Sequence, residues 1–60
     1  MNAEDEAKRI YDRVVSEGKR TDYYYSSNFD AWAKEIAINR AKSGHSGEFL
    51  NNVIAAINKM

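Results

Sequence analysis

Three consecutive tyrosines, Tyr23, Tyr24 and Tyr25, follow two cations, Lys19 and Arg20, in a stretch that separates two helical patterns. Tyrosine and arginine are enriched among the residues that dominate binding interfaces. Each aromatic side chain can bury on the order of 150–250 Å² against the core or against a ligand. These residue types therefore indicate recognition. The tyrosines either close one end of the core or contact another molecule.

Acid–base and metal chemistry have few candidates in this chain. His45 is the only histidine, it lies in a turn rich in glycine and serine, and the sequence has no cysteine. A general base needs a positioned neighbour and a pocket, and zinc sites need several histidine or cysteine ligands. The acids Glu4, Asp5 and Glu6 are interpreted as first-turn residues that suit the positive end of a helix. We therefore assign no catalytic residue, metal ligand or cofactor, and expect a non-enzymatic protein.

A protein-binding surface around residues 19–27 is the preferred hypothesis. Its expected members are Arg20, Tyr23, Tyr24, Tyr25 and Ile38. A partner that binds only the folded chain also stabilises it by mass action, which suits a chain this small. The sequence therefore favours a small interaction module, an accessory or regulatory factor whose partner is another protein or a second copy of itself.

Nucleic acid is the alternative partner. Asn51 and Asn52 lie on the last helical pattern after a short turn, as in a helix-turn-helix, and asparagine can pair with adenine. In a second version, Arg13, Lys19 and Arg20 hold backbone phosphates while the tyrosines stack on bases. Nine cationic side chains balance nine acidic ones, and the last helical pattern carries one cation. Because phosphate affinity comes from lysine and arginine, this charge pattern favours a protein partner.

The elements that must position these residues are amphipathic helices. The first is expected over residues 3–17, where apolar residues recur at spacings of three and four, one face of an α-helix. Those residues are Ala7, Ile10, Tyr11, Val14 and Val15. Asn2 can cap the start of this helix, and Gly18 stands where a left-handed residue would end it.

A second helix is expected over residues 28–43, with Ser27 or Asn28 as its cap. Arg40 projects into the middle of its apolar face, so we expect its stem to pack across the bundle while its guanidinium reaches water or the last carbonyls. Ile38 lies on the opposite side of the helix. We therefore expect Ile38 to face away from the core and to mark a contact surface.

A third helix, the most apolar, is expected over residues 47–59 with Ser46 as its cap. The connections between the helices are short, which favours direct contact between neighbours. The sequence thus predicts an all-α fold, a compact three-helix bundle forming a single domain over residues 1–60. A helical hairpin that dimerises is the alternative.

Size and composition limit where the chain can act. A chain of sixty residues buries only roughly 60% of the surface that it exposes when unfolded, so its stability is small. No stretch approaches the about 20 apolar residues needed to cross a bilayer, and the first residues are acidic, unlike a secretory signal. We therefore expect no membrane contact and a cytoplasmic location.

Overall fold

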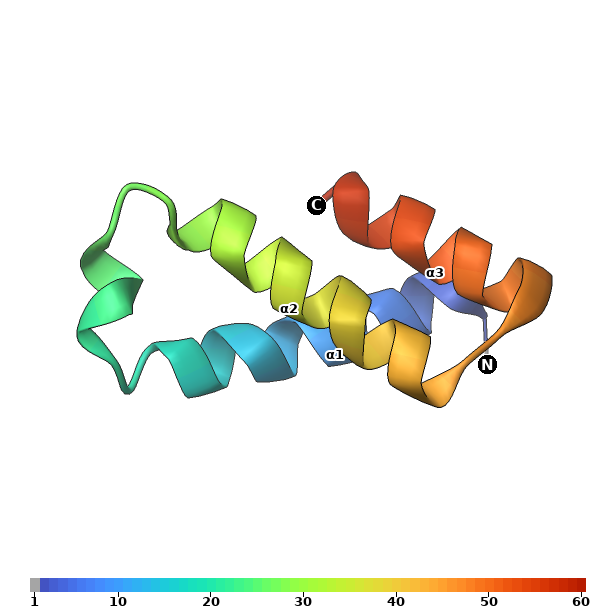
Figure 1. Cartoon of the computed structure of the whole chain (residues 1–60), viewed down its shortest axis with the longest axis horizontal. Coiled ribbons are helices and arrows are strands. Elements are labelled where there is room, and N and C mark those ends of the chain that lie inside the picture. Colours follow the sequence, from blue (N-terminus) through green and yellow to red (C-terminus); the bar gives the residue numbers. More distant parts are fainter. Residues whose placement is uncertain (1) are drawn as a thin grey trace.

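The computed structural model describes residues 2–60, with the backbone alone for Tyr23, and within this range it contains three α-helices and one short 3₁₀-helix. These elements are α1 (Ala3–Gly18), η1 (Asp22–Tyr25), α2 (Phe29–Gly44) and α3 (Gly47–Asn58). Each α-helix packs against the other two in a body of 35 × 17 × 16 Å (Figure 1). The predicted three-helix bundle is confirmed, and every predicted helix end lies within one residue of the observed one.

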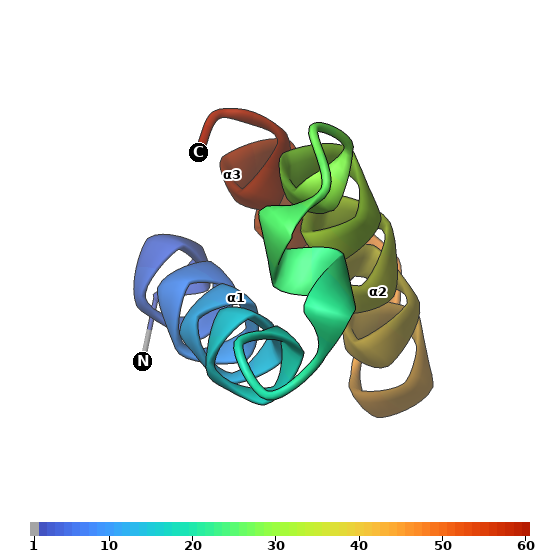
Figure 2. The same ribbon diagram turned by 90° about the vertical axis from the view of Figure 1, so that its left-hand side faces the viewer.

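α1 and α2 run antiparallel along the long axis, and α3 returns beside the half of the molecule that holds the start of α1 (Figures 1 and 2). The connection between α1 and α2 occupies one end of this axis, and the α2–α3 connection lies at the other (Figure 1). No helix within residues 2–60 is long and apolar enough to cross a membrane. The two connections are thus separated by the length of the bundle.

The core takes residues from all three helices and is lined with small side chains on α2. Its buried apolar members are Ala7, Ile10, Val14, Phe29, Ala33, Ala37, Ala41, Val53 and Ile57. On α2 they recur every four residues, which places them on one stripe of the helix. Because three of these four are alanines, the backbone of α2 can lie close to its neighbours. The larger fully buried side chains, Val14, Val53 and Ile57, come from α1 and α3.

The helix starts differ in how they are capped. The Asn2 side chain accepts a hydrogen bond from the Asp5 backbone N–H at 2.8 Å, as predicted for α1. Asn28 and Ser46 occupy the N-cap positions of α2 and α3, and neither makes a capping hydrogen bond through its side chain. Before α2, the Ser26 hydroxyl instead accepts from the Asn28 backbone N–H at 3.1 Å. The predictions of side-chain capping at α2 and α3 were therefore wrong.

Gly18 is required for a different reason than predicted. It does not adopt a positive φ, and it is the buried last residue of α1. A Cβ placed on it would lie 2.6–2.8 Å from ring atoms of Phe29 and Trp32. Real Cβ atoms do not approach other atoms this closely. Gly18 therefore lets two aromatic rings of α2 pack directly on the backbone of α1.

Ile38 does not face away from the core, as the sequence suggested; it is half-buried and packs against the core cluster. The reason is that α2 contacts both α1 and α3, so its buried arc is wide. Trp32 and Arg40 lie on the side of α2 that faces α1. At 100° per residue, Ile38 lies on the opposite side of the buried stripe of α2. A single-face interpretation of α2 could not assign that flank to a second neighbour.

Candidate interaction surface and buried charge cluster

Four aromatic rings lead from the core to solvent at the α1–α2 end of the molecule. The Phe29 ring lies 5.4 Å from that of Trp32, and the Tyr24 ring lies 5.0 Å from Phe29, nearly perpendicular to it. Tyr25 follows at 5.4 Å from Tyr24, again edge to face. Exposure rises along this series from 8% for Phe29 to 38% for Tyr24 and 85% for Tyr25. Tyr24 therefore covers the core, while Tyr25 uses Tyr24 as a support and presents its own ring to solvent.

Backbone turns hold the two tyrosines in place. The Gly18 carbonyl accepts from both the backbone N–H and the hydroxyl of Thr21, at 3.0 and 2.8 Å. The Tyr24 N–H then donates to the Thr21 carbonyl at 3.3 Å, which closes the turn of η1. These bonds tie the segment to the end of α1 with no residue in a left-handed conformation. Tyr25 is thus exposed as the last residue of a hydrogen-bonded turn.

Two cations flank the rings. The Lys19 ammonium lies 5.9 Å from the centre of the Tyr24 ring, within the range of a cation–π contact. Arg20, the next residue, is exposed. We name the group formed by Lys19, Arg20, Tyr24 and Tyr25 the tyrosine surface. The side chain of Tyr23, predicted to belong to it, lies outside the described residues.

Ile38 is not part of the tyrosine surface, because it packs against the core on the flank of α2 away from Trp32. The predicted nucleic-acid residues are divided as well. Asn51 and Asn52 are exposed on the first half of α3, whereas Lys19 and Arg20 lie at the opposite end of the long axis (Figure 1). Of the predicted protein-binding residues, Arg20, Tyr24 and Tyr25 thus share the α1–α2 connection, and the two alternative nucleic-acid versions, Asn51 with Asn52 and Lys19 with Arg20, use opposite ends of the molecule.

A buried carboxylate, Glu6, forms a cluster that the sequence analysis missed. Its side chain is 3% exposed and both of its oxygens are bound: Arg9 donates from Nε and Nη2, each at 2.8 Å. Nε2 of His45 lies 2.6 Å from the second oxygen. The Arg9 hydrogen bonds, followed by that of His45, lower the pKa of Glu6 from 4.5 to about 2. Glu6 is therefore an ionised group in the packed region, and it ties α1 to the α2–α3 connection.

The signal for this cluster was present but weak. Glu6 precedes the core residues Ala7 and Ile10, which places it beside the apolar stripe of α1. His45, which the sequence indicated only as a turn residue, follows α2 and also contacts the Phe49 ring, with the ring centres 5.0 Å apart. Periodicity gives the side of α1 on which Glu6 lies. It cannot give a partner 39 residues away.

A groove of about 280 Å³ lies beside this cluster, between α1 and the end of α2. Arg9, Arg13, Arg40 and His45 line it, and we name it the arginine groove. The carboxylate of Glu17 accepts from both terminal nitrogens of Arg40 and lies 3.5 Å from Nε of Arg13. These cations, Arg40 first, lower the pKa of Glu17. Arg40 is exposed, as expected, and its guanidinium also binds a carboxylate of α1, a partner that the sequence analysis did not identify.

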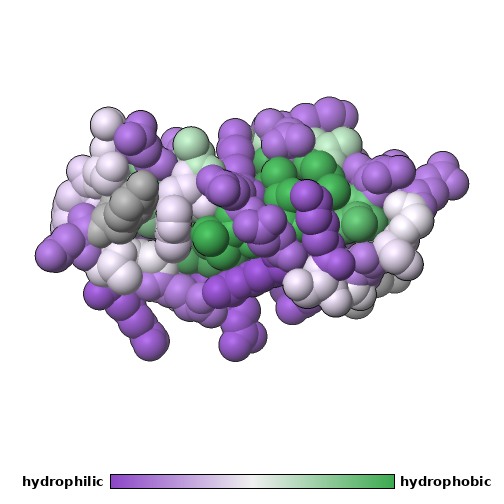
Figure 3. All heavy atoms as spheres, viewed as in Figure 1, coloured by the Kyte–Doolittle hydropathy of each residue, from purple (hydrophilic) through white to green (hydrophobic). Residues whose placement is uncertain are grey.

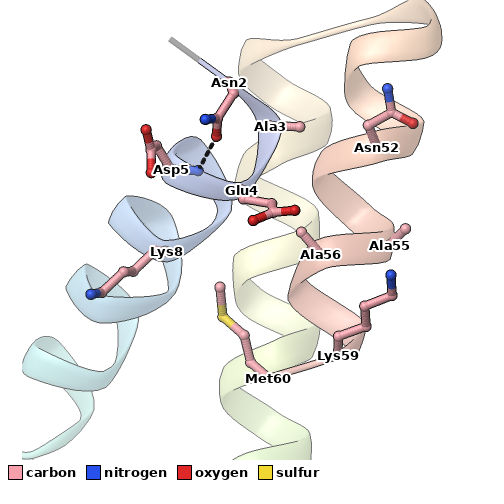
Figure 4. A pocket seen from close by; sticks show the side chains of 10 residues that line it. All are labelled: Asn2, Ala3, Glu4, Asp5, Lys8, Asn52, Ala55, Ala56, Lys59 and Met60. Carbon is pink, nitrogen blue, oxygen red and sulfur yellow. Dashed lines mark hydrogen bonds between the residues drawn. The ribbon is translucent and has the colours of Figure 1, made fainter.

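A wider, open hollow of about 830 Å³ separates the first turns of α1 from the last turns of α3 (Figure 4). Its lining mixes alanines with charged residues of both signs: it includes Ala3, Glu4 and Lys8 of α1, Ala56 of α3, and Lys59, which follows α3. The Asn2 side chain at its rim is engaged in capping α1 (Figure 4). Because this lining mixes charges of both signs, it favours no particular ligand.

On the face seen in Figure 3, polar side chains predominate and an apolar patch remains over α2 and α3. Within residues 2–60, no group of three or more histidine, aspartate and glutamate side chains is placed to hold a metal ion. Comparison with protein-family models, curated proteins and solved structures finds no match to this chain.

Proposed function

We propose that this protein is a small, non-enzymatic interaction module that acts in the cytoplasm by binding another protein, or a second copy of itself, through the tyrosine surface. The observation that carries the proposal is Tyr25, which is 85% exposed at the end of the hydrogen-bonded turn η1. An aromatic ring in this position makes no contribution to the core that requires its size. It does offer a partner a large apolar area with a hydroxyl at its tip.

The surroundings of Tyr25 fit a binding anchor. Its ring rests edge to face on Tyr24, which in turn rests on the buried Phe29. A ring that is already positioned loses little conformational entropy when it binds. Lys19 and Arg20 add positive charge beside the rings, and tyrosine with arginine is the combination most enriched in interface hot spots. We expect the partner to present an apolar pocket with acidic or carbonyl groups at its edge.

The test is affinity capture from extracts of the source cells with three forms of the protein. Tyr25→Ala removes the anchor, and we expect the partner to be lost or its affinity to fall by about tenfold or more, as for hot-spot residues. Lys42→Ala, an exposed cation near the end of α2, is the matched control and should retain the partner. Light scattering across a concentration series identifies self-association. A partner retained equally by wild type and Tyr25→Ala would contradict the proposal.

Single-stranded nucleic acid is the second candidate, favoured by the same exposed ring beside Lys19 and Arg20. Unpaired bases stack on such rings while cations hold the backbone. In this case the affinity for an oligonucleotide should fall with a slope near −0.7 per neutralised phosphate on a log–log plot against salt. Lys19→Ala combined with Arg20→Ala should reduce that slope. Because the chain has no net charge, we rank this candidate below a protein partner.

A further inference from the structure

We propose that the arginine groove is a binding site for a phosphoryl dianion, either inorganic phosphate or a small phosphate monoester. Three arginines and one histidine line it from three parts of the chain, together with the carboxylate Glu6, both of whose oxygens are already bound: Arg9 and Arg13 come from α1, Arg40 from α2, and His45 from the α2–α3 connection. The tyrosine surface contributes no residue to the lining. This site is therefore independent of the proposed function.

Resident carboxylates hold the arginines in position. Glu6 binds Arg9 through two hydrogen bonds of 2.8 Å, and Glu17 binds Arg40 through both terminal nitrogens while it also attracts Arg13. Arginine is a long side chain, and fixing it costs conformational entropy. Because the two glutamates already restrict these side chains, part of that cost is met before a ligand arrives. The arginine side chains that line the groove are thus partly fixed in position by the two glutamates.

The guanidiniums retain donors for a ligand. Nε and Nη2 of Arg9 donate to Glu6, and Nη1 of Arg9 makes no hydrogen bond with this carboxylate. Glu17 binds the two terminal nitrogens of Arg40, so Nε of Arg40 is not used in this ion pair. Glu17 lies near Nε of Arg13, so both terminal nitrogens of Arg13 are not used in that contact. Arginine can bind two acceptors along different edges of its planar group. A ligand can therefore bind without displacing either glutamate.

Charge and size indicate which anion fits. The three arginines exceed Glu6 and Glu17 by one positive charge, and His45 adds to the excess whenever it is protonated. A phosphoryl dianion offers three terminal oxygens, enough for arginines from two helices at once, whereas a carboxylate offers two. The volume of about 280 Å³ lies just below the usual range for drug-sized ligands, about 300–1,000 Å³. The groove therefore suits a phosphate with little attached to it.

A nucleic-acid backbone fits this groove less well. A phosphodiester carries one charge per phosphate, and its binding depends on cations spread along successive phosphates. The arginine groove places its cations along a single hollow of about 280 Å³. The exposed Lys19 and Arg20 of the tyrosine surface line no part of it. The structure thus favours a single, compact phosphoryl group.

The experiment is an NMR titration of the full chain with phosphate at constant ionic strength, chloride being the reference anion. We follow the Nε–H signals of the arginines and the ring signals of His45. Saturable shifts at Arg9, Arg13, Arg40 and His45 are expected with phosphate and not with chloride. Glycerol 3-phosphate is titrated in parallel. Tighter binding of glycerol 3-phosphate than of phosphate assigns the site to a phosphorylated metabolite, and the reverse order assigns it to phosphate itself.

Arg13→Gln is the decisive variant, because Arg13 is 73% exposed and its link to Glu17 is long, so the fold does not depend on it. We expect its phosphate affinity to fall about tenfold, the effect of losing one charge-assisted hydrogen bond. Lys42→Gln removes the same charge from α2 outside the groove and should bind as wild type does. Circular dichroism spectra and melting curves establish that both variants are folded.

Three outcomes would overturn the proposal. Shifts that do not saturate would show general charge attraction. Equal weakening by Arg13→Gln and Lys42→Gln would show that the groove has no special role. Phosphate binding that is lost on Lys19→Ala with Arg20→Ala and unchanged by Arg13→Gln would assign phosphate recognition to the tyrosine surface.

Discussion

The two connections of this bundle use opposite means to hold their helices. Between α1 and α2, aromatic rings pack on the backbone of Gly18 and on one another, with Tyr24 as the outermost supporting ring. Between α2 and α3, the connection is only two residues long, and one of them, His45, binds the buried Glu6 of α1. The first end is held by packing of apolar rings, and the second by an ionised group with its hydrogen-bond partners.

At each end of the molecule, some residues hold the fold together and others keep hydrogen-bond donors or exposed surface. At the charged end, Glu6 has both oxygens bound, so it serves the fold, and the arginines around it keep donors for a ligand. At the aromatic end, exposure rises from Phe29 to Tyr24 to Tyr25, so that among these three rings Tyr25 contributes least to the core. In the proposed function, this is the ring that remains available to a partner.

The largest effect on stability is expected at Gly18. Gly18→Ala places a methyl group 2.6–2.8 Å from the rings of Phe29 and Trp32, which must shift. Overpacking of this kind costs about 1–3 kcal/mol of unfolding free energy, measured by urea denaturation. Gly44→Ala is the control, since its added Cβ meets nothing within 4 Å. That control should be neutral or stabilising by up to about 1 kcal/mol, because alanine favours helix. Equal behaviour of the two variants would contradict ring packing on Gly18.

The charged end predicts a specific acid sensitivity. The pKa of Glu6 in the folded protein, about 2, lies below its ordinary value of 4.5. Glu6 therefore stabilises the fold at pH values above about 4.5, and this contribution is lost as the pH falls from 4.5 to about 2. Urea midpoints measured over this range should fall for the wild type. Glu6→Gln should be less stable at pH 7 and should lose less on acidification.

The exposed acid Glu4 provides the control for the acid sensitivity. Glu4→Gln keeps the contacts of Glu6 and should follow the wild-type pH curve closely. If Glu6→Gln lost as much stability on acidification as the wild type does, the buried carboxylate would not be the source of the effect. The contrast between the two ends of the molecule would then have to be abandoned.

The smallest effects distinguish the two tyrosines. Tyr24→Ala removes a ring in contact with Phe29, and an aromatic pair contributes about 0.5–1.5 kcal/mol, so its thermal midpoint should fall. Tyr25→Ala removes a ring that is 85% exposed, and its unfolding free energy should stay within about 0.5 kcal/mol of wild type. A large loss of stability in Tyr25→Ala would show that Tyr25 serves the core, and the interaction surface would lose its anchor.

Several features of the fold followed from local patterns. The spacing of Ile10, Val14 and their neighbours predicted α1, and Asn2 was predicted to cap it. The short connections predicted that neighbouring helices are in contact. The grouping of Arg20 with Tyr24 and Tyr25 also followed, since they are neighbours in the chain. These predictions held because each depends on residues within about one helical turn of one another, or on neighbours in the sequence.

The predictions that were wrong depended on which helix faces which. Ile38 was placed outside because one apolar stripe was assumed for α2, whereas that helix contacts two others. The partner of the exposed Arg40, Glu17 of α1, was missed. The cluster of Glu6 and His45 was missed for the same reason. Side chains 39 residues apart meet only once the helices have a fixed direction and crossing.

The sequence by itself therefore determined three amphipathic helices and an aromatic, cationic connection, because helix periodicity and neighbouring residue types are local properties. The structural roles of particular residues depend on the tertiary structure. It made Gly18 a contact point for rings, placed Tyr24 over Phe29 and left Tyr25 exposed. It also buried Glu6 and gathered the arginines around a groove. Burial and charge pairing are properties of positions in space, and those positions exist only after the helices pack.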